Sequence, residues 1–389
     1  MWKEVSLGEI LTIQRGGSPR PITSYLTDSE NGINWVKISN TQGISKYIYE
    51  TQQKIKPEGI SKTRVVYSGD FILSNSMSFC KPYIMRTTGC IHDGWLVLRK
   101  KETNLDENFL YYILRSDLIY KQFKRLASGT TVKNLNINVV KKVQIPLPPL
   151  EEQKRIAEIL DRADAIRQKR KGVIALTEEL ARSTFLEMFG DPTTNSKGWN
   201  LKSLGELAKI SGGGTPSKKC PQYYEGNICW VTSKDMNVHM LVDTKNHITE
   251  KAIEDSSTKL VGIGTLLVVV KSKILMKRLP VVRTKVPTCF NQDIKAIELY
   301  DSWMTRYCHW HMKLGQDTLL NKARGLNTEG LTLEHFNNYQ IMIPTYSEIM
   351  RFTKVEKTIE ESLLASRQAL ENANNLFNSL LQRAFKGEL

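Results

Sequence analysis

The sequence has few cysteines, and no two of its six are separated by two residues as in a C-x-x-C motif. A secreted disulfide-rich domain is shorter and denser in cysteine, so six scattered cysteines in 389 residues indicate reduced thiols and a cytoplasmic location. The longest nearly unbroken apolar run, residues 260–270, has 11 residues including two glycines, whereas a membrane span needs about 20. Residues 1–4 contain no apolar core of a signal peptide. These absences predict a soluble cytoplasmic protein that does not enter a membrane.

Complete catalytic motifs are also missing. Residues 78–81 fit S-x-x-K but lack the companion S-D-N and K-T-G boxes. Residues 212–219 lack the spacing of a phosphate-binding loop, and Pro216 removes an amide donor, so a turn that presents lysines is expected there. Residues 147–150 lack the Asp or Asn and the aromatic residue of an adenine methyltransferase loop. His309 and His311 would point about 200° apart on a helix and so cannot share a metal ion. We expect neither catalysis nor a metal site in this chain.

Positive charge is in excess, but only in two parts of the chain. Lys and Arg total 55 against 40 Asp and Glu, a formal charge of +15. Residues 1–150 carry a net charge of +9 and residues 191–345 carry +6, whereas residues 151–190 and 346–389 are neutral. Two basic blocks joined by neutral segments indicate two units that bind nucleic acid. The alternative is that the surface lysines merely keep the protein in solution.

Each neutral segment has the pattern of one long helix. Residues 151–189 contain no proline and one glycine, follow the prolines at 146, 148 and 149, and stop at Gly190. Residues 346–389 follow Pro344 in the same way. Such helices would be about 58–66 Å long, and each carries an apolar seam that has to be covered, so the two are expected to pack on each other. The predicted seam residues are Ile156, Ile159, Ala163, Ile166, Val173 and Leu180 in the first, and Ile359, Leu363, Leu370, Ala373, Phe377 and Leu380 in the second.

The second half of the chain repeats the first. Residues 2–19 read W-K-E-V-S-L-G-E-I-L-T-I-Q-R-G-G-S-P, and residues 199–216 read W-N-L-K-S-L-G-E-L-A-K-I-S-G-G-G-T-P. Trp35 matches Trp230, and residues 165–168 of the first helix match residues 365–368 of the second. The order is therefore domain, long helix, domain, long helix. We expect an α/β (α+β) chain with globular domains at 1–150 and 191–345, and long helices at 151–190 and 346–389.

The whole chain resembles the specificity subunit of type I restriction–modification systems. The resemblance lies in the W-x-x-x-x-L-G-E opening with its G-G-x-P loop, and in residues 146–156, 163–170 and 185–191. Residues 342–348, M-I-P-T-Y-S-E, replace the proline-rich junction in the second copy, so that junction is recognised by its position. The resemblance implies two target recognition domains, each reading one half of a split, asymmetric site in double-stranded DNA. It also implies that the helices form an antiparallel coiled coil that spaces the domains and docks two methyltransferase subunits.

Polar loops at matching places in the two copies are the candidate DNA contacts. Residues 37–40 and 232–235 each follow the strand that carries the matched tryptophan, and residues 128–134 and 322–327 each follow an expected helix. Lysine, arginine and asparagine side chains grip phosphates and read purine edges. The candidate residues are Arg15, Lys37, Asn40, Lys81, Thr130, Lys133 and Asn134 in the first copy, and Lys218, Lys219, Lys234, Lys271, Lys273, Arg324 and Asn327 in the second.

By resemblance, the chemistry of such a complex belongs to other subunits. S-adenosylmethionine, ATP and Mg²⁺ are expected on the methyltransferase and restriction/translocase subunits, and no cofactor is expected on this chain. A stand-alone DNA-binding regulator is the alternative, although no short helix-turn-helix-like module is evident. A fused enzyme is a third possibility, which the missing motifs oppose.

Overall fold

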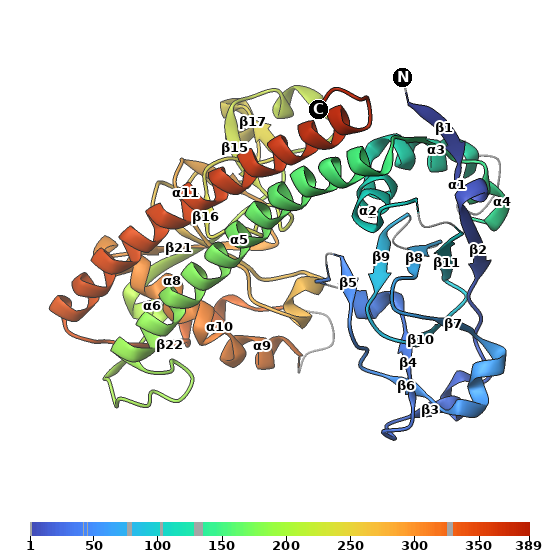
Figure 1. Ribbon diagram of the computed structural model, residues 1–389. Coiled ribbons are helices and arrows are strands. Elements are labelled where there is room, and N and C mark those ends of the chain that lie inside the picture. The colour runs from blue at the N-terminus through green and yellow to red at the C-terminus, as the bar shows by residue number, and fades with distance from the viewer. Residues whose placement is uncertain are drawn as a thin grey trace. The chain divides into compact units, whose positions relative to one another are not determined.

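The computed structural model contains two compact units, each with its own sheets and hydrophobic core. The first unit comprises Met1–Lys171 with Gln368–Leu389, and the second comprises Gly172–Arg367. Two sheet-containing domains and two long helices are present, as Figure 1 shows, so the predicted α/β fold class is confirmed. The structure describes residues 2–41, 43–44, 46–75, 80–101, 104–127, 135–324 and 330–389.

Two five-stranded sheets form the body of the first unit. Their strand orders are β2-β11-β8-β9-β5 and β3-β6-β4-β10-β7, and β1 pairs with β12 in a separate antiparallel ladder. The strands are β1 (Lys3–Ser6), β2 (Leu11–Arg15), β3 (Leu26–Thr27), β4 (Ile33–Val36), β5 (Tyr47–Ile48), β6 (Lys54–Ile55), β7 (Arg64–Val66), β8 (Phe71–Ser74), β9 (Pro82–Met85), β10 (Gly89–Ile91), β11 (Trp95–Lys100) and β12 (Gln144–Leu147). The helices are α1 (Leu7–Ile10), η1 (Ile22–Tyr25), η2 (Ile38–Thr41), η3 (Pro57–Lys62), α2 (Glu107–Arg115), α3 (Asp117–Ala127) and α4 (Ile137–Lys141).

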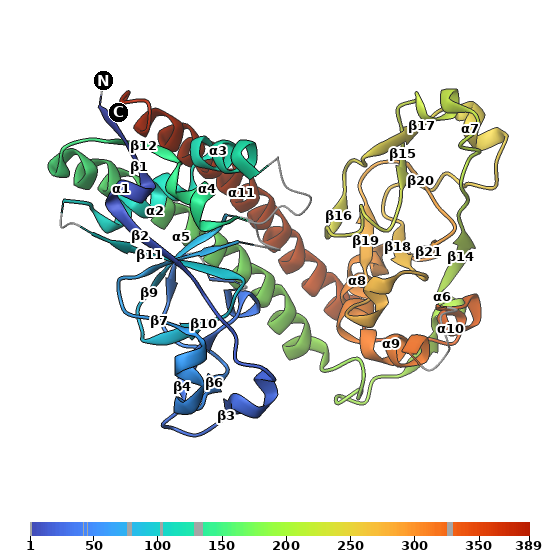
Figure 2. The same cartoon turned by 90° about the vertical axis from the view of Figure 1, so that its right-hand side faces the viewer.

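The second unit has the same plan with a smaller second sheet. Its main sheet has the order β14-β21-β18-β19-β16, seen in Figure 2, its second sheet has the order β17-β15-β20, and β13 pairs with β22. The strands are β13 (Leu201–Ser203), β14 (Ala208–Gly212), β15 (Ile228–Val231), β16 (Met240–Leu241), β17 (Asn246–Ile248), β18 (Leu266–Val269), β19 (Val281–Thr284), β20 (Thr288–Phe290), β21 (Ile294–Leu299) and β22 (Gln340–Met342). The helices are α6 (Leu204–Leu207), η4 (Pro221–Tyr224), α7 (Glu250–Glu254), η5 (Lys273–Met276), η6 (Ser302–Met304), α8 (Thr305–Leu314), α9 (Gln316–Arg324) and α10 (Leu333–Asn337).

The sequence repeat is a repeat of strand register. In the first unit, β4 and β10 run parallel and Trp35 lies opposite Cys90; in the second, β15 and β20 run parallel and Trp230 lies opposite Cys289. In the second unit, Trp230 Nε1 donates to the carbonyl of Gly214 in the glycine-rich loop at 3.2 Å. In the first unit, Trp95 Nε1 donates to the carbonyl of Val36, the residue after Trp35, at 3.0 Å. The matched tryptophans therefore fix equivalent places in the two copies.

Each long helix is a single unbroken element. The first, α5, spans Leu150–Phe189, and the second, α11, spans Tyr346–Ala384. Arg167 on α5 bonds Asn374 on α11, Glu178 pairs with Arg367, and the ring of Phe185 packs against Phe352. Residue numbers fall on α11 as they rise on α5, so the helices pack antiparallel. In the part of the chain that the structure describes, neither these helices nor any other could cross a lipid bilayer.

Most of the predicted α11 seam is buried or half-buried, whereas half of the predicted α5 seam is exposed. Ile359, Leu363 and Phe377 are buried on α11, where Leu370, Ala373 and Leu380 are half-buried; on α5, Ile156 and Ala163 are buried and Ile159 is half-buried. Three further predicted seam residues are instead exposed: Ile166 (47%), Val173 (48%) and Leu180 (54%).

Polar contacts explain why the α5 seam was misplaced. The side of α5 that is buried carries Asp164 and Arg167, which pair with each other at 2.7 Å, and the Arg167 guanidinium lies over the ring of Phe377. An apolar heptad pattern does not identify a buried face that contains charged residues. It selects the neighbouring face, where Ile166, Val173 and Leu180 recur every seven residues but are about half exposed and belong to no core cluster of the described residues.

Carboxylates on the long helices attach each helix to a sheet-bearing body. In the first unit, Asp161 of α5 accepts from Lys46 Nζ at 2.8 Å, from Tyr112 Oη at 2.6 Å and from Asn108 Nδ2 at 2.9 Å. In the second unit, Glu356 and Glu360 of α11 contact a buried arginine of β19 and a half-buried arginine of α8. The contacts are Arg283 and Lys285 with Glu360, and Arg306 with both carboxylates.

The histidines of α8 belong to the core of the second unit. His311 Nε2 faces the amide of Met342 at 3.1 Å, and its Nδ1 lies 3.3 Å from Tyr339 Oη. Burial lowers the pKa of His311 to about 3, so the ring is neutral and can accept from that amide. His309 is also buried and packs beside His239. Both α8 histidines therefore serve packing.

We predict that Phe185→Ala lowers the free energy of unfolding by about 3–5 kcal/mol, because it empties a fully buried aromatic site. The ring contacts Phe189, Tyr307 and Phe352. Leu176→Ala on the same helix is the control; this leucine is 73% exposed, so its change should stay within about 0.5 kcal/mol. Equilibrium urea denaturation of the full chain measures both variants. Equal losses would contradict the assignment of the buried face.

Candidate nucleic-acid interface

A cleft of about 890 Å³ opens beside the matched tryptophan of the first unit. Its walls come from the loop after β2, the turn after β4, the start of β9 and the loop after β10. Two of the predicted residues, Lys37 and Lys81, line this cleft, and Arg20 adds a third cation. Arg15 lies beside it, with Nε donating to the carbonyl of Asp93 at 3.1 Å. Four basic side chains thus surround one concave surface.

The turn after β4 is built by the side chain of Asn40. Its Oδ1 accepts from the amide of Lys37 at 2.8 Å. In the second unit, Asp235 Oδ2 accepts from the amide of Thr232 at 2.9 Å, in the equivalent turn after β15. Part of the Asn40 side chain is therefore committed to the fold, and only its Nδ2 is left to face a ligand. The residues between, Ser39 and Lys234, are exposed.

The G-G-x-P loops are packing motifs. Gly16 donates its amide to the carbonyl of Trp95 and Gly17 to that of Ile91; Gly214 likewise donates to Phe290. A Cβ on Gly16 would lie 2.1 Å from the carbonyl oxygen of His92, and one on Gly213 would lie 2.2 Å from that of Phe290. With these amides used internally, the loops are turns packed on a strand end.

A serine hydroxyl group joins two loops of the first cleft, the loop after β2 and the loop after β10. Ser18 Oγ donates to Asp93 Oδ1 at 2.9 Å, and this contact holds the pKa of the Asp93 carboxyl below its usual value. Thr215 and Gln292 make the equivalent contact in the second unit. Burial lowers the pKa of the neighbouring His92, so its ring is neutral at pH 7. The first cleft therefore presents cations and one carboxylate around a neutral imidazole.

The candidate lysines of the second unit lie on its surface. Lys218, Lys219, Lys234, Lys271 and Lys273 are all exposed, and none pairs with a carboxylate among the residues that the structure describes. Lys218 and Lys219 follow the G-G-x-P loop, whereas Lys273 begins η5. These ammonium groups are available to a polyanion, because nothing in the described structure neutralises them.

Several predicted contacts lie outside the described residues. These are Thr130, Lys133, Asn134 and Asn327; Arg324 ends α9, and its side chain is likewise not described.

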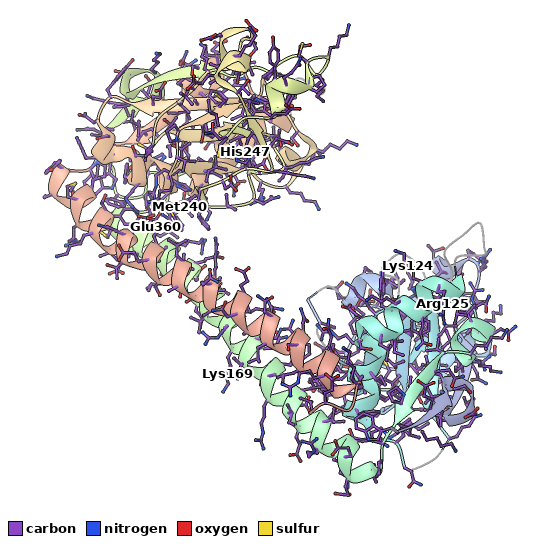
Figure 3. All side chains as sticks on the ribbon, turned by 90° about the horizontal axis from the view of Figure 1, so that it is seen from above. Lys124, Arg125, Lys169, Met240, His247 and Glu360 are labelled. Atoms are coloured by element: carbon purple, nitrogen blue, oxygen red, sulfur yellow. The ribbon has the colours of Figure 1, made fainter. Side chains whose placement is uncertain are left out.

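Sequence reasoning missed several residues around the first cleft and on α3. Trp35, Tyr83, His92 and Asp93 line the cleft, and of these only Trp35 carried a signal, through its match with Trp230. His92 and Asp93 follow a three-residue strand that periodicity does not detect. Lys124 and Arg125 in the last turn of α3 are exposed, as Figure 3 shows, and their clustering in the sequence could have identified them.

We predict that Gly16→Ala distorts the first cleft and lowers the free energy of unfolding by at least about 1–3 kcal/mol, because its Cβ meets rigid backbone. Gly172→Ala is the control; a Cβ there meets nothing within 4 Å on exposed helix, and alanine should stabilise it by about 0.5–1 kcal/mol. Thermal denaturation compares the two variants. A tolerated Gly16→Ala would show that the loop can move away from β10.

Two named relatives match this chain in sequence. The specificity subunit of the type I restriction enzyme EcoR124I/EcoR124II from Escherichia coli is 33% identical over 227 residues, which cover 55% of this chain and 54% of the relative. The specificity subunit of the type I restriction enzyme MjaIX from Methanocaldococcus jannaschii is 22% identical over 364 residues, covering 88% of this chain and 83% of the relative. The chain thus spans about half of the first relative and most of the second.

Solved structures share the fold over the whole chain. The crystal structure of the type I restriction-modification S subunit from M. genitalium has a TM-score of 0.59 at 14% identity, covering 99% of this chain and 96% of that one. A chain from a structural study of the assembly and conformational transition of the type I R-M system has a TM-score of 0.58 at 20% identity, covering 100% and 98%. The model of the type I restriction modification DNA specificity domain matches residues 1–176 and again residues 196–369. These two segments carry the two copies of the fold, so the chain belongs to the type I restriction modification DNA specificity domain family.

Proposed function

We propose that this chain is the DNA-recognition subunit of a type I restriction–modification complex, in which each unit reads one half of a bipartite, asymmetric DNA site. The observation that carries the proposal is that two copies of one fold differ in the side chains at equivalent loop positions. Lys37 corresponds to Thr232, and His92 and Asp93 correspond to Asn291 and Gln292. Two units with the same fold but different loop side chains are suited to two different half-sites.

The charges of the loops support contacts with the DNA backbone. Lys37 and Lys81 at the first cleft and the exposed candidate lysines of the second unit supply ammonium groups for phosphates, and none of them pairs with a carboxylate of the described residues. Amide side chains supply the hydrogen bonds that distinguish bases. In the second unit the exposed Gln292 takes this part through its Nε2, since its oxygen accepts from Thr215 and the neighbouring Asn291 is buried and bonded to Asp293. The basic groups would set affinity and the amide groups specificity.

The chemical steps of the complex would take place on partner subunits. Methyl transfer needs S-adenosylmethionine, and DNA translocation and cleavage need ATP and Mg²⁺; we assign these to modification and restriction/translocase subunits. Because the substrate is cellular DNA, the complex would work in the cytoplasm. This chain would contribute recognition, and its long helices would set the separation of the half-sites.

An exposed apolar stripe on α5 is the surface that we assign to a modification subunit. Val173, Leu176 and Leu180 lie at three- and four-residue steps on one face and are 48%, 73% and 54% exposed. Lys169, seven residues before Leu176, projects from α5 away from α11 in Figure 3, on the side where this stripe lies. Such an exposed apolar stripe is expected to be covered in the assembly.

Exchange of one recognition unit tests the proposal. Replacing residues 1–150 with the matching block of a relative should change one half of the methylated site in a host that expresses the complete system, and leave the other half unchanged. Methylome sequencing reads the site directly. A change in both halves would mean that the units do not read independently, and no sequence-specific methylation at all would contradict the proposed function.

Insertion of a charge into the α5 stripe tests the docking surface. We expect Leu176→Glu to abolish co-purification with the modification subunit, because docking would bury an unpaired carboxylate. Ala175→Glu, an exposed position on another face of α5, is the matched control and should keep the complex. Normal assembly of Leu176→Glu would place the docking surface elsewhere. A stand-alone regulator, the alternative function, would bind its DNA site without any partner.

A further inference from the structure

Three potential metal ligands meet at one edge of the second sheet of the second unit. Cys229 on β15 and His247 on β17 lie directly opposite each other in the antiparallel ladder. Asp243 precedes β17 and lies four residues before His247. Thiol, carboxylate and imidazole ligand atoms from these residues all lie within 4.8 Å of one another. Figure 3 labels His247 in this unit.

The distances between these atoms are close to those in a tetrahedral metal site. Cys229 Sγ lies 3.7 Å from Asp243 Oδ1, and His247 Nε2 lies 2.8 Å from the same oxygen. Zinc binds sulfur at about 2.3 Å and nitrogen or oxygen at about 2.0–2.2 Å, which separates neighbouring tetrahedral ligands by roughly 3.3–3.7 Å. The sulfur–oxygen separation already fits, and the nitrogen–oxygen separation has to lengthen by only about half an ångström.

The backbone around the cluster holds the carboxylate in place. Asp243 Oδ1 accepts from the amide of Thr244 at 2.8 Å, and Thr244 Oγ1 donates to the carbonyl of Asn246 at 2.7 Å. The amide of Trp230 donates to Thr244 Oγ1 at 3.2 Å. Such outer contacts orient metal ligands in proteins. The Asp243 side chain is 70% exposed, so an ion and a water molecule can reach the buried sulfur from solvent.

The first unit shows that the fold does not require these three residues. Asn34 lies opposite Lys54 where Cys229 lies opposite His247. Thr51 there donates to the carbonyl of Gln53, as Thr244 donates to that of Asn246. The same turn and ladder are therefore built with an amide and an ammonium group, which are not zinc ligands. Only the second copy carries a thiol, an imidazole and a carboxylate at these places.

We propose that Cys229, Asp243 and His247 bind a divalent metal ion of the zinc class, with water as the fourth ligand. Binding replaces the thiol proton of Cys229, which is released to solvent, and the Nε2 proton through which His247 bonds Asp243, which passes through solvent to Nδ1 of the same ring. The freed sulfur, nitrogen and carboxylate oxygen then bind the ion. The proposal departs from the expectation that this chain has no metal site, and it does not depend on the proposed role in DNA recognition.

The ion would stabilise a small and weakly buried sheet. The apolar cluster beside β15 contains four buried residues, which is little for an independent core. The amide of Lys245 donates to Asp235 Oδ1 at 3.3 Å, so the metal-holding segment also supports the turn that carries Lys234. If the proposed function is correct, metal binding orders one of the DNA-facing loops.

Cobalt substitution tests the site in the full chain. After dialysis against a chelator, one equivalent of Co²⁺ should produce the near-ultraviolet charge-transfer absorption of a cobalt–thiolate bond, and Zn²⁺ should displace it. Cys229→Ser and His247→Gln should lose this band. Cys220→Ser, which removes a half-buried cysteine of the same unit, should keep it. No band in the wild-type chain, or a band that survives Cys229→Ser, would overturn the assignment.

A second measurement needs no variant and guards against misfolding. Zn²⁺ should slow alkylation of Cys229 by iodoacetamide at least tenfold, as read by mass spectrometry of peptides, while the rate at Cys220 stays unchanged. Equal protection of both cysteines, or of neither, would contradict a specific site. Asn34→Cys with Lys54→His completes the comparison, because with Glu50 it places the same three ligand types on the equivalent ladder of the first unit and should add a second equivalent of Co²⁺.

Discussion

Attachment of a carboxylate on a long helix to a sheet-bearing body is the contact on which the rest of the structure depends. Asp161 makes this attachment in the first unit, and Glu356 and Glu360 make it in the second. Burial lowers the pKa of Arg283 to about 10, which shows how far the second cluster is withdrawn from water. Loss of one partner in such a cluster typically costs about 3–5 kcal/mol, because the other charge stays buried and unpaired. Because these contacts attach each body to a long helix, the loops of each unit keep a constant orientation relative to the part of the helix that belongs to that unit.

The duplicated fold was predictable because its anchors are residues with special requirements. Gly16 and Gly213 are glycines since no side chain fits between the loop and the strand end, and Trp35 and Trp230 occupy equivalent register positions. Because only certain residue types meet these requirements, the same residues occur at equivalent positions in both copies. The contact face of α5 was not predictable from hydrophobicity, because Asp164 and Arg167 take part in it while equally regular leucines and valines face solvent.

The candidate site was predictable in part. Lys37 and Lys81, 44 residues apart in sequence, meet at one cleft, although Lys37 follows β4 in one sheet and Lys81 precedes β9 in the other. Asn40 illustrates the converse: its type and place suggested base recognition, but its oxygen closes a turn. The Cys229, Asp243 and His247 cluster follows no sequence motif. The register of β15 and β17 places Cys229 opposite His247, and the Asp243 side chain, from before β17, reaches the His247 ring.

The division of the long helices between the units has a consequence for synthesis on the ribosome. The second unit is one continuous stretch, Gly172–Arg367, whereas the first needs Gln368–Leu389 to cover Ile156 and Leu160 of α5. The body translated first is therefore completed last, and its nascent core keeps an uncovered apolar face while the entire second body emerges. Contacts of such long sequence separation form slowly. We expect ribosome-associated chaperones to bind this uncovered apolar face of α5, which carries Ile156 and Leu160.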